Sequence, residues 1–181
     1  VGTASMMAAE GAIFPVYQLM QEHGVDWDPS IYLPAVVGYY ADPDGNMLSM
    51  PFNSSTPVMY YNKDIFKKAG LDPEMPPKTW NELAEASRKI ISSGAAPCGF
   101  TTGWQSWVQL ENFSALHNTP FATKANGFEG LDTEFKFNSD LHKRHIGNMK
   151  KWQDEGVFKY GGRRSDSAPL FYTGECAMYM N

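Results

Sequence analysis

Apolar side chains recur at helical spacing in several stretches of the chain, which predicts amphipathic helices. The clearest begins at Thr79, because Thr79 and Glu82 fit the S/T-x-x-E capping box that satisfies free amides at a helix start. Gly94 provides a stop signal. The residues expected to form the buried stripe are Leu83, Ala86, Ile90 and Ile91. The pattern therefore predicts one well-delimited helix between residues 79 and 94.

Other segments show the same spacing with weaker start and stop signals. The further predicted helices cover residues 63–70, 107–116 and 140–155, with a short helix at 170–172. Residues 5–24 also show helical spacing, with Pro15 expected in the first turn of a helix that ends at Gly24. The helix at 140–155 is expected to bury Leu141, His145, Met149 and Trp152. Residues 26–40 carry two prolines at positions 29 and 34 and few periodic signals, so they are interpreted as loop with a short helical turn.

Strands are predicted where β-branched and aromatic residues gather between turn signals. These segments are MLSMPF (47–52), VMYYN (58–62), CGFTT (98–102) and CAMYM (176–180). Strands that alternate with helices indicate an α/β fold with a largely parallel sheet covered by helices. Ligands of such sheets gather at the carboxyl ends of the strands, where Gly103 and Trp104 follow the third predicted strand.

Composition narrows the functional classes. Of 181 residues, 43% are hydrophobic and 19% charged, which is typical of a folded globular protein. The net charge of −5 argues against a nucleic-acid partner, because such proteins carry a basic patch that neutralises phosphates. No apolar run approaches the roughly 20 residues that cross a bilayer, so the chain is not expected to span a membrane.

The sequence shows no arrangement typical of catalysis or metal binding. It lacks a glycine-rich phosphate loop and a G-x-S-x-G elbow. The acidic pairs lie in turn-like loops and are interpreted as solvated: Asp42 with Asp44, and Asp72 with Glu74. His142 and His145 share a helix without a third ligand, so a partly exposed pair is expected. We therefore predict no catalytic residues, no metal site, no cofactor and no enzymatic activity.

Two cysteines, Cys98 and Cys176, are separated by 78 residues and show no metal-ligand spacing. Each lies in a predicted strand. If the strands are neighbours and the compartment is oxidising, the cysteines can form a disulfide. Two separate buried thiols are the alternative.

TTGWQSWVQ is the segment whose role is least obvious, because Trp104 and Trp107 stand among small polar residues after a strand. The two rings would share one side if a helix had already begun at Trp104. They could then stack on the C–H faces of a polyol or sugar while polar neighbours form hydrogen bonds. A tryptophan-rich core is the alternative. The NSST run, which contains Ser55, offers hydroxyls as a binding loop or as an ordinary turn.

Several blocks together carry a resemblance to a known family. YYNKD, a helix ending in KKAGLD, a proline pair and TWNEL resemble the extracytoplasmic solute-binding proteins of ABC importers, of the carbohydrate-binding type. More narrowly, the VGTA opening, LSMPFNSSTPV, GWQSWVQLENFSA and FYTGECAM resemble the glycerophosphate-binding branch. The resemblance extends from Val1 to Met178.

This resemblance implies an α/β, periplasmic-binding-protein-like fold whose two lobes close over a ligand without chemistry. Residues 1–54 would be the last part of the first lobe and residues 55–181 most of the second, as a middle portion of a longer protein. The implied ligand is sn-glycerol-3-phosphate, extended to glycerophosphodiesters, and the implied partners are the permease subunits of the importer. The implied location is the periplasm, where a Cys98–Cys176 bridge would be stable.

Three residues match ligand positions of the family. Trp104 and Trp107 match the two tryptophans that sandwich the glycerol moiety, and Ser55 matches a ligand serine. Further family positions, including an arginine suited to the phosphate, fall outside the chain. The rival interpretations are a sugar or oligosaccharide ligand on the same fold, a hydrolase of glycerophosphodiesters, and a folded but inert fragment.

Overall fold

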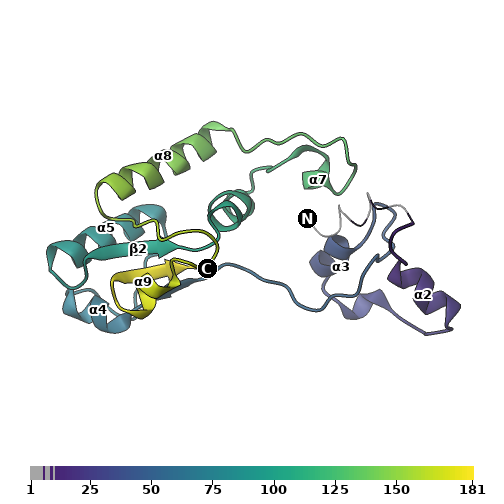
Figure 1. Ribbon diagram of the computed structural model, residues 1–181, viewed down its shortest axis with the longest axis horizontal. Coiled ribbons are helices and arrows are strands. Elements are labelled where there is room, and N and C mark those ends of the chain that lie inside the picture. The colour runs from purple at the N-terminus through teal and green to yellow at the C-terminus, as the bar shows by residue number, and fades with distance from the viewer. Residues whose placement is uncertain (1–5, 7–8, 10) are drawn as a thin grey trace. The chain divides into compact units, whose positions relative to one another are not determined.

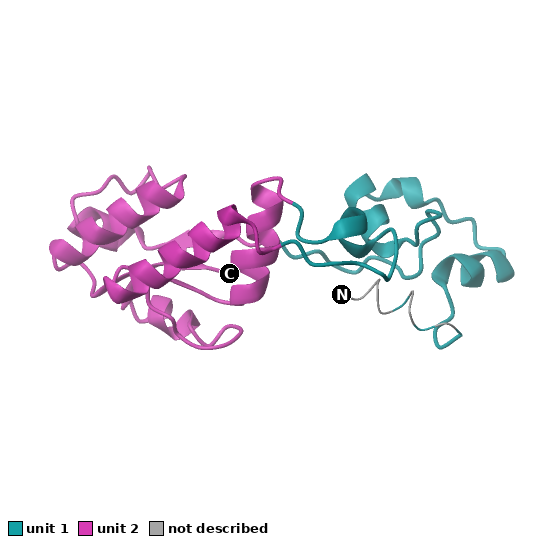
Figure 2. Ribbon diagram, turned by 90° about the horizontal axis from the view of Figure 1, so that it is seen from above, with its two compact units in different colours: residues 1–56, 120–136 teal, residues 57–119, 137–181 magenta. Residues whose placement is uncertain are grey.

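The computed structural model describes residues 6, 9 and 11–181 (Figure 1). It divides into two compact units (Figure 2). Unit 1 comprises Val1–Thr56 and Pro120–Lys136, and unit 2 comprises Pro57–Thr119 and Phe137–Asn181. The division into lobes at residues 54 and 55 stays a prediction. In the part of the chain that is described, no helix is long and apolar enough to cross a membrane.

Unit 1 contains short helices around a small core. They are α2 (Val16–Glu22), the 3₁₀ turn η1 (Pro29–Ile31), α3 (Pro34–Tyr40) and α7 (Thr123–Gly127). The core is formed by Val16, Ala41 and Met47. Helix α2 starts directly after Pro15, as its fixed φ favours. Residues 34–40, interpreted from the sequence mainly as loop, form a full helix because Pro34 occupies its first turn.

The strand predicted at residues 47–52 is wrong. Met47 makes a single bridge with Ala41, and the chain then becomes exposed. A strand needs a partner, but the residues before the turn at 42–46 are in α3 and cannot pair with it. The turn itself is confirmed. The Asp42 carboxylate accepts hydrogen bonds from the amides of Asp44 and Asn46, so it organises the turn.

Unit 2 is built on a sheet with strand order β1-β3-β2. The strands are β1 (Met59–Tyr61), β2 (Cys98–Thr102) and β3 (Cys176–Met180). Strand β3 pairs with β2 in parallel and with β1 antiparallel, so the sheet is mixed where a largely parallel one was expected. Residues 157–159 continue the sheet beyond β2 through hydrogen bonds with Phe100.

Helices cover this sheet on both faces. They are α4 (Lys63–Lys68), α5 (Trp80–Ser92), α8 (Asp140–Asp154) and α9 (Ala168–Tyr172), with the π-helical η2 (Trp107–Asn112) running into α6 (Phe113–Leu116). Side chains of α4, α5 and α8 share one core with Phe100 and Met178 of the sheet. On the other face Phe171 of α9 stacks against Tyr179. Figure 1 shows α9 and β3 adjacent in yellow.

Local capping interactions start these helices, and the capping box predicted for α5 is confirmed. Thr79 and Glu82 form the complete capping box of α5. The Asn62 side chain caps α4 by accepting hydrogen bonds from the amides of Asp64 and Ile65, and Ser139 caps α8. Each cap satisfies amides that have no partner within the helix, so the helix boundaries follow from short-range chemistry.

The expectation of a partly exposed His142–His145 pair is wrong, because both side chains are buried, whereas the burial of His145 expected from helical spacing is confirmed. The His145 ring stacks on Phe113 with centroids 3.8 Å apart, and its Nε2 donates to Oε1 of Gln109 at 3.0 Å. His142 bonds Ser114 and Ser139 through its two ring nitrogens. Helix α8 turns these residues inward because they lie on the same face as Met149 and Trp152.

His145 should make the protein less stable in mild acid. Burial, and then the nearby His117 and His142, lower the pKa of His145 from 6.5 to about 4. His145 therefore takes up a proton between pH 6.5 and 4 in the unfolded chain, whereas in the folded chain it stays neutral over this range. The free energy of unfolding should fall by about 2–3 kcal/mol as the pH drops through this window. Urea unfolding at a series of pH values measures this loss.

The matched comparison uses His145→Gln, which keeps an amide donor for Gln109, and His23→Gln, which changes an exposed histidine. The first variant should flatten the pH dependence between 6.5 and 4, and the second should leave it unchanged. Equal slopes in both variants would show that His145 is not the group responsible.

Cys98 and Cys176 are register partners in the parallel strands β2 and β3. Their Cα atoms are 4.4 Å apart and their sulfurs are bonded. Of the two alternatives that the sequence left open, the structure therefore has the disulfide. The bond closes a chain segment with a sequence separation of 78 residues, so it restricts the unfolded chain strongly.

We expect protein made in an oxidising compartment to show no reactive thiol after denaturation, and two after reduction. Replacing both cysteines by serine should lower the free energy of unfolding by up to about 4 kcal/mol, because a long loop is no longer closed in the unfolded state. Thiol titration and urea unfolding check these outcomes. Two free thiols in the unreduced, denatured protein would contradict the bridge.

Candidate functional site

The end of β2 leads into a tight turn at Gly103. A Cβ atom placed on Gly103 would lie 2.8 Å from Oδ1 of Asn181 and 2.9 Å from the hydroxyl of Tyr179. A side chain at position 103 would force these groups to shift, so glycine favours the close approach of the ends of β2 and β3. Burial raises the pKa of the Tyr179 phenol, which therefore stays protonated beside the turn. The candidate site begins at Gly103, where the chain leaves the sheet.

Trp104 follows this turn and is not part of the core, since its side chain is 42% exposed. Its backbone is left-handed, with φ of 44°, and its amide donates to the Arg164 carbonyl at 2.8 Å. The indole Nε1 donates to Oγ of Ser165 at 3.0 Å, and the Arg164 guanidinium carbon lies 5.8 Å from the ring centroid. The ring is thus held at the surface by specific contacts.

Trp107 is half-buried and opens η2. The predicted helix at 107–116 is present, but its first part has the wider π-helical hydrogen bonding, which is frequent at functional sites. Asn112 donates its side-chain amide to the Trp107 carbonyl at 2.9 Å. Helical structure begins at Gln105, so the condition that the helix has already started at Trp104 is not met. The left-handed backbone, rather than helical spacing, orients Trp104.

Thr102 fixes the segment that contains both tryptophans, residues 104–107 (the tryptophan segment), to the sheet. Its carbonyl accepts hydrogen bonds from the side chains of Gln105 and Ser167, and its Oγ1 accepts from Gln109 at 3.0 Å. Gln109 is buried and also bonds His145 in the core. This series of hydrogen bonds connects the segment that carries Trp104 and Trp107 to the buried interior of unit 2, as a preorganised site requires.

The loop at residues 161–167 is part of this site, although the sequence indicated only a polar loop. Gln105 donates to the Gly162 carbonyl at 2.7 Å, and Arg163 donates its amide to the Asp166 carboxylate. The two adjacent glycines before two arginines were the available signal. A glycine pair allows close backbone approach, and arginines are typical of anion recognition.

Ser55, the third predicted ligand residue, lies in unit 1 and is exposed, as are its neighbours from Phe52 to Thr56. The structure thus brings Trp104 and Trp107 into one segment of unit 2 and keeps Ser55 in the other unit. The joint action of the three residues on one ligand stays a prediction.

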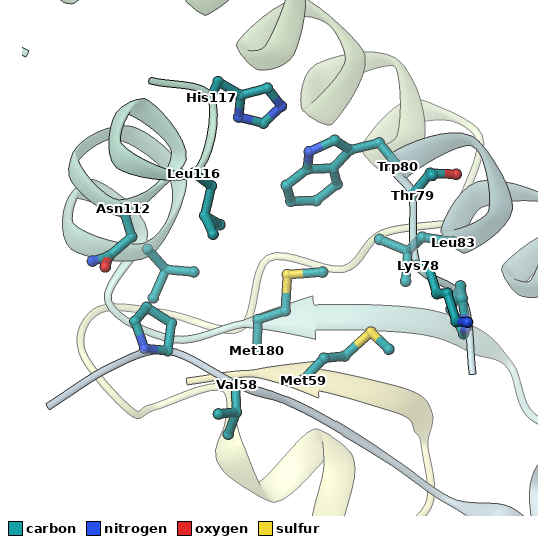
Figure 3. Close-up of a pocket in the computed structure, with 13 residues that line it drawn as sticks. Val58, Met59, Lys78, Thr79, Trp80, Leu83, Asn112, Leu116, His117 and Met180 are labelled. Carbon is teal, nitrogen blue, oxygen red and sulfur yellow. The ribbon is translucent and has the colours of Figure 1, made fainter. Parts of the chain in front are cut away.

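Unit 2 also contains an apolar pocket of about 500 Å³, whose lining includes Val108 but neither Trp104 nor Trp107 (Figure 3). Its lining includes Met59, Trp80, Leu116, His117 and Met180. In Figure 3 the Trp80 ring and the Met180 side chain border the same space. The lining offers few polar groups, so this pocket suits apolar side chains better than a charged solute. Within the described residues no group of three or more His, Cys, Asp or Glu side chains could hold a metal ion.

Comparison with known sequences gives a consistent result. The family described as bacterial extracellular solute-binding protein matches residues 1–181. The sn-glycerol-3-phosphate-binding periplasmic protein UgpB of Brucella abortus is 52% identical over 177 residues, covering 98% of this chain. UgpB of Shigella flexneri is 54% identical over 179 residues, again covering 98% of this chain. The chain spans 41% and 40% of the length of these two relatives.

Solved structures show the same fold. An ABC transporter solute-binding protein from Thermotoga lettingae, bound with alpha-D-tagatose, superposes on 97% of this chain and 44% of its own, with a TM-score of 0.71 and 20% identity. Maltose-bound MalE3 of T. maritima superposes on 93% of this chain and 41% of its own, with a TM-score of 0.68 and 17% identity. The predicted α/β, periplasmic-binding-protein-like fold class is confirmed. With its whole length matched by the family, the chain belongs to the bacterial extracellular solute-binding proteins.

Proposed function

We propose that this chain is part of the solute-binding subunit of an ABC importer that captures sn-glycerol-3-phosphate and delivers it to the permease subunits. The single observation that supports this most is the identity of about half its residues with the UgpB proteins, over 98% of the chain. Glycerophosphodiesters share the glycerol and phosphoryl groups and are included in the proposed ligand class. Such a subunit works in the periplasm, where the Cys98–Cys176 disulfide is stable.

The tryptophan segment supplies the chemistry that the glycerol part of this ligand needs. The exposed face of Trp104 and the half-buried Trp107 offer flat apolar surface for the C–H groups of a three-carbon polyol. Ser55 is proposed to form a hydrogen bond with the polar groups of the ligand. Binding, followed by closure of two lobes over the ligand, needs no catalytic group. We therefore propose that the protein is not an enzyme.

A sugar or oligosaccharide is the second candidate ligand. It is favoured by the solved structures of the same fold, which hold alpha-D-tagatose and maltose. Those proteins are 20% and 17% identical to this chain and share its fold alone. Stacked indoles serve pyranose rings as well as glycerol, so the choice between the two ligand classes depends on the charge of the ligand.

The proposal predicts that intrinsic tryptophan fluorescence of the full-length gene product responds to sn-glycerol-3-phosphate in a saturable way. Trp104→Ala and Trp107→Ala should each weaken binding by roughly tenfold or more, because each removes a stacking surface. Trp27→Phe, which changes a tryptophan of unit 1, serves as the control and should bind like the unchanged protein.

Maltose, titrated in parallel, separates the candidate ligands. A response to maltose alone would keep the fold and overturn the ligand. Unchanged affinity for sn-glycerol-3-phosphate in both alanine variants would show that the two indoles do not contact it. Absence of any response, by fluorescence and by calorimetry, would favour an inert protein over either binding function.

A further inference from the structure

Two non-glycine residues with left-handed backbones face each other at the tryptophan segment. Trp104 has φ of 44° and Arg164 has φ of 48°, and the amide of the first donates to the carbonyl of the second at 2.8 Å. Residues with side chains adopt this conformation only when surrounding contacts enforce it. Such strained positions gather at ligand-binding sites and switch regions. The contact between Trp104 and the loop at 161–167 is therefore a candidate ligand-binding site.

The contacts around the pair fix the loop in place. The Trp104 indole donates to Oγ of Ser165 at 3.0 Å, and the Gln105 side chain donates to the Gly162 carbonyl at 2.7 Å. On the other side Ser167 donates to the Thr102 carbonyl at 2.9 Å. Hydrogen bonds on both sides of Arg164 thus hold its Cα at a set distance from the ring, and its long side chain reaches over that ring.

The charge of Arg164 is not neutralised by an ion pair within the described residues. The guanidinium is exposed and lies 5.8 Å from the centroid of Trp104. Asp166, the acidic residue of the same loop, accepts a hydrogen bond from the backbone amide of Arg163. A planar cation with several donors therefore stands beside the stacking surface, in a chain whose net charge is −5.

We propose that Arg164 is a specificity-determining residue that selects solutes with an anionic phosphoryl group over neutral polyols and sugars. This inference rests on the proposed binding of a glycerol phosphate at Trp104. A ligand whose carbon chain stacks on the indole extends its phosphoryl oxygens toward the guanidinium, whose fork of N–H groups matches them geometrically. The charge-assisted hydrogen bonds replace the weaker contact of the cation with the ring. An acidic protein otherwise repels an anion, so this local cation also favours its approach.

Calorimetric titration of the full-length gene product with sn-glycerol-3-phosphate tests this, using Arg164→Gln, Arg164→Lys and the control Arg144→Gln, which changes an exposed arginine of α8. Glutamine keeps a polar side chain and the left-handed strain of residue 164 but is shorter and removes its charge. We expect Arg164→Gln to raise Kd roughly tenfold and Arg164→Lys to raise it less, because lysine keeps the charge without the fork. Arg144→Gln should change Kd by about twofold at most. The dependence of Kd on ionic strength should also be smaller in Arg164→Gln.

The outcomes separate this inference from the function on which it rests. If the unchanged protein binds sn-glycerol-3-phosphate but Arg164→Gln matches Arg144→Gln, the role of Arg164 is overturned and the function stands. Tighter binding by Arg164→Gln would also overturn the role, since Arg164 would then cover the ring in competition with the ligand. If the unchanged protein binds maltose and not sn-glycerol-3-phosphate, both proposals fail. Equal melting temperatures of all variants exclude a loss of folding as the cause.

Discussion

The parallel pairing of β2 with β3 is the interaction on which the rest of unit 2 depends. It places Cys98 opposite Cys176 at one end and Thr102 opposite Met180 at the other. The disulfide ties the strand starts, so the register at the far end is fixed before any ligand is present. There the amide of Gly103 donates to the Met180 carbonyl at 2.8 Å, and the chain leaves the sheet toward Trp104.

The core and the tryptophan segment are joined by buried polar groups. His145 bonds Gln109, Gln109 bonds Thr102, and the Thr102 carbonyl holds Gln105 and Ser167. Each member is satisfied by the next, which makes a buried polar network rigid instead of costly. The site is therefore supported by the hydrophobic core as well as by its own loop. A binding surface supported in this way loses little conformational entropy when it closes on a ligand.

Much of unit 2 could be predicted from the sequence because its signals are local. The capping box at Thr79 and Glu82 and the caps at Asn62 and Ser139 act over a few residues, and the helices begin where they indicate. The antiparallel direction of β1 could not be predicted, since strand direction depends on contacts distant in sequence. The same holds for residues 47–52, whose composition suits a strand but whose neighbours across the turn form α3.

The candidate site was predicted in part. An aromatic segment at the end of a strand pointed to Trp104 and Trp107, whereas the contribution of Arg164 and Ser165 needed the tertiary contacts between β2 and the loop at 161–167. Helical spacing predicted the burial of His145, whereas that of His142 was missed because polar residues are usually assigned to the surface. Their partners, Ser114 and Gln109, come from the segment that follows the tryptophans, and no spacing rule connects it with α8.

The left-handed backbone of Trp104 bears on how this protein could be engineered. A redesign guided by stability alone would place glycine or asparagine at position 104, since these residues tolerate φ near 44° and would recover about 1–2 kcal/mol. The same change would delete the exposed ring and its bond to Ser165. Thermostability and solute recognition thus make opposing demands on a single residue, and a more robust variant has to gain its stability elsewhere in the chain.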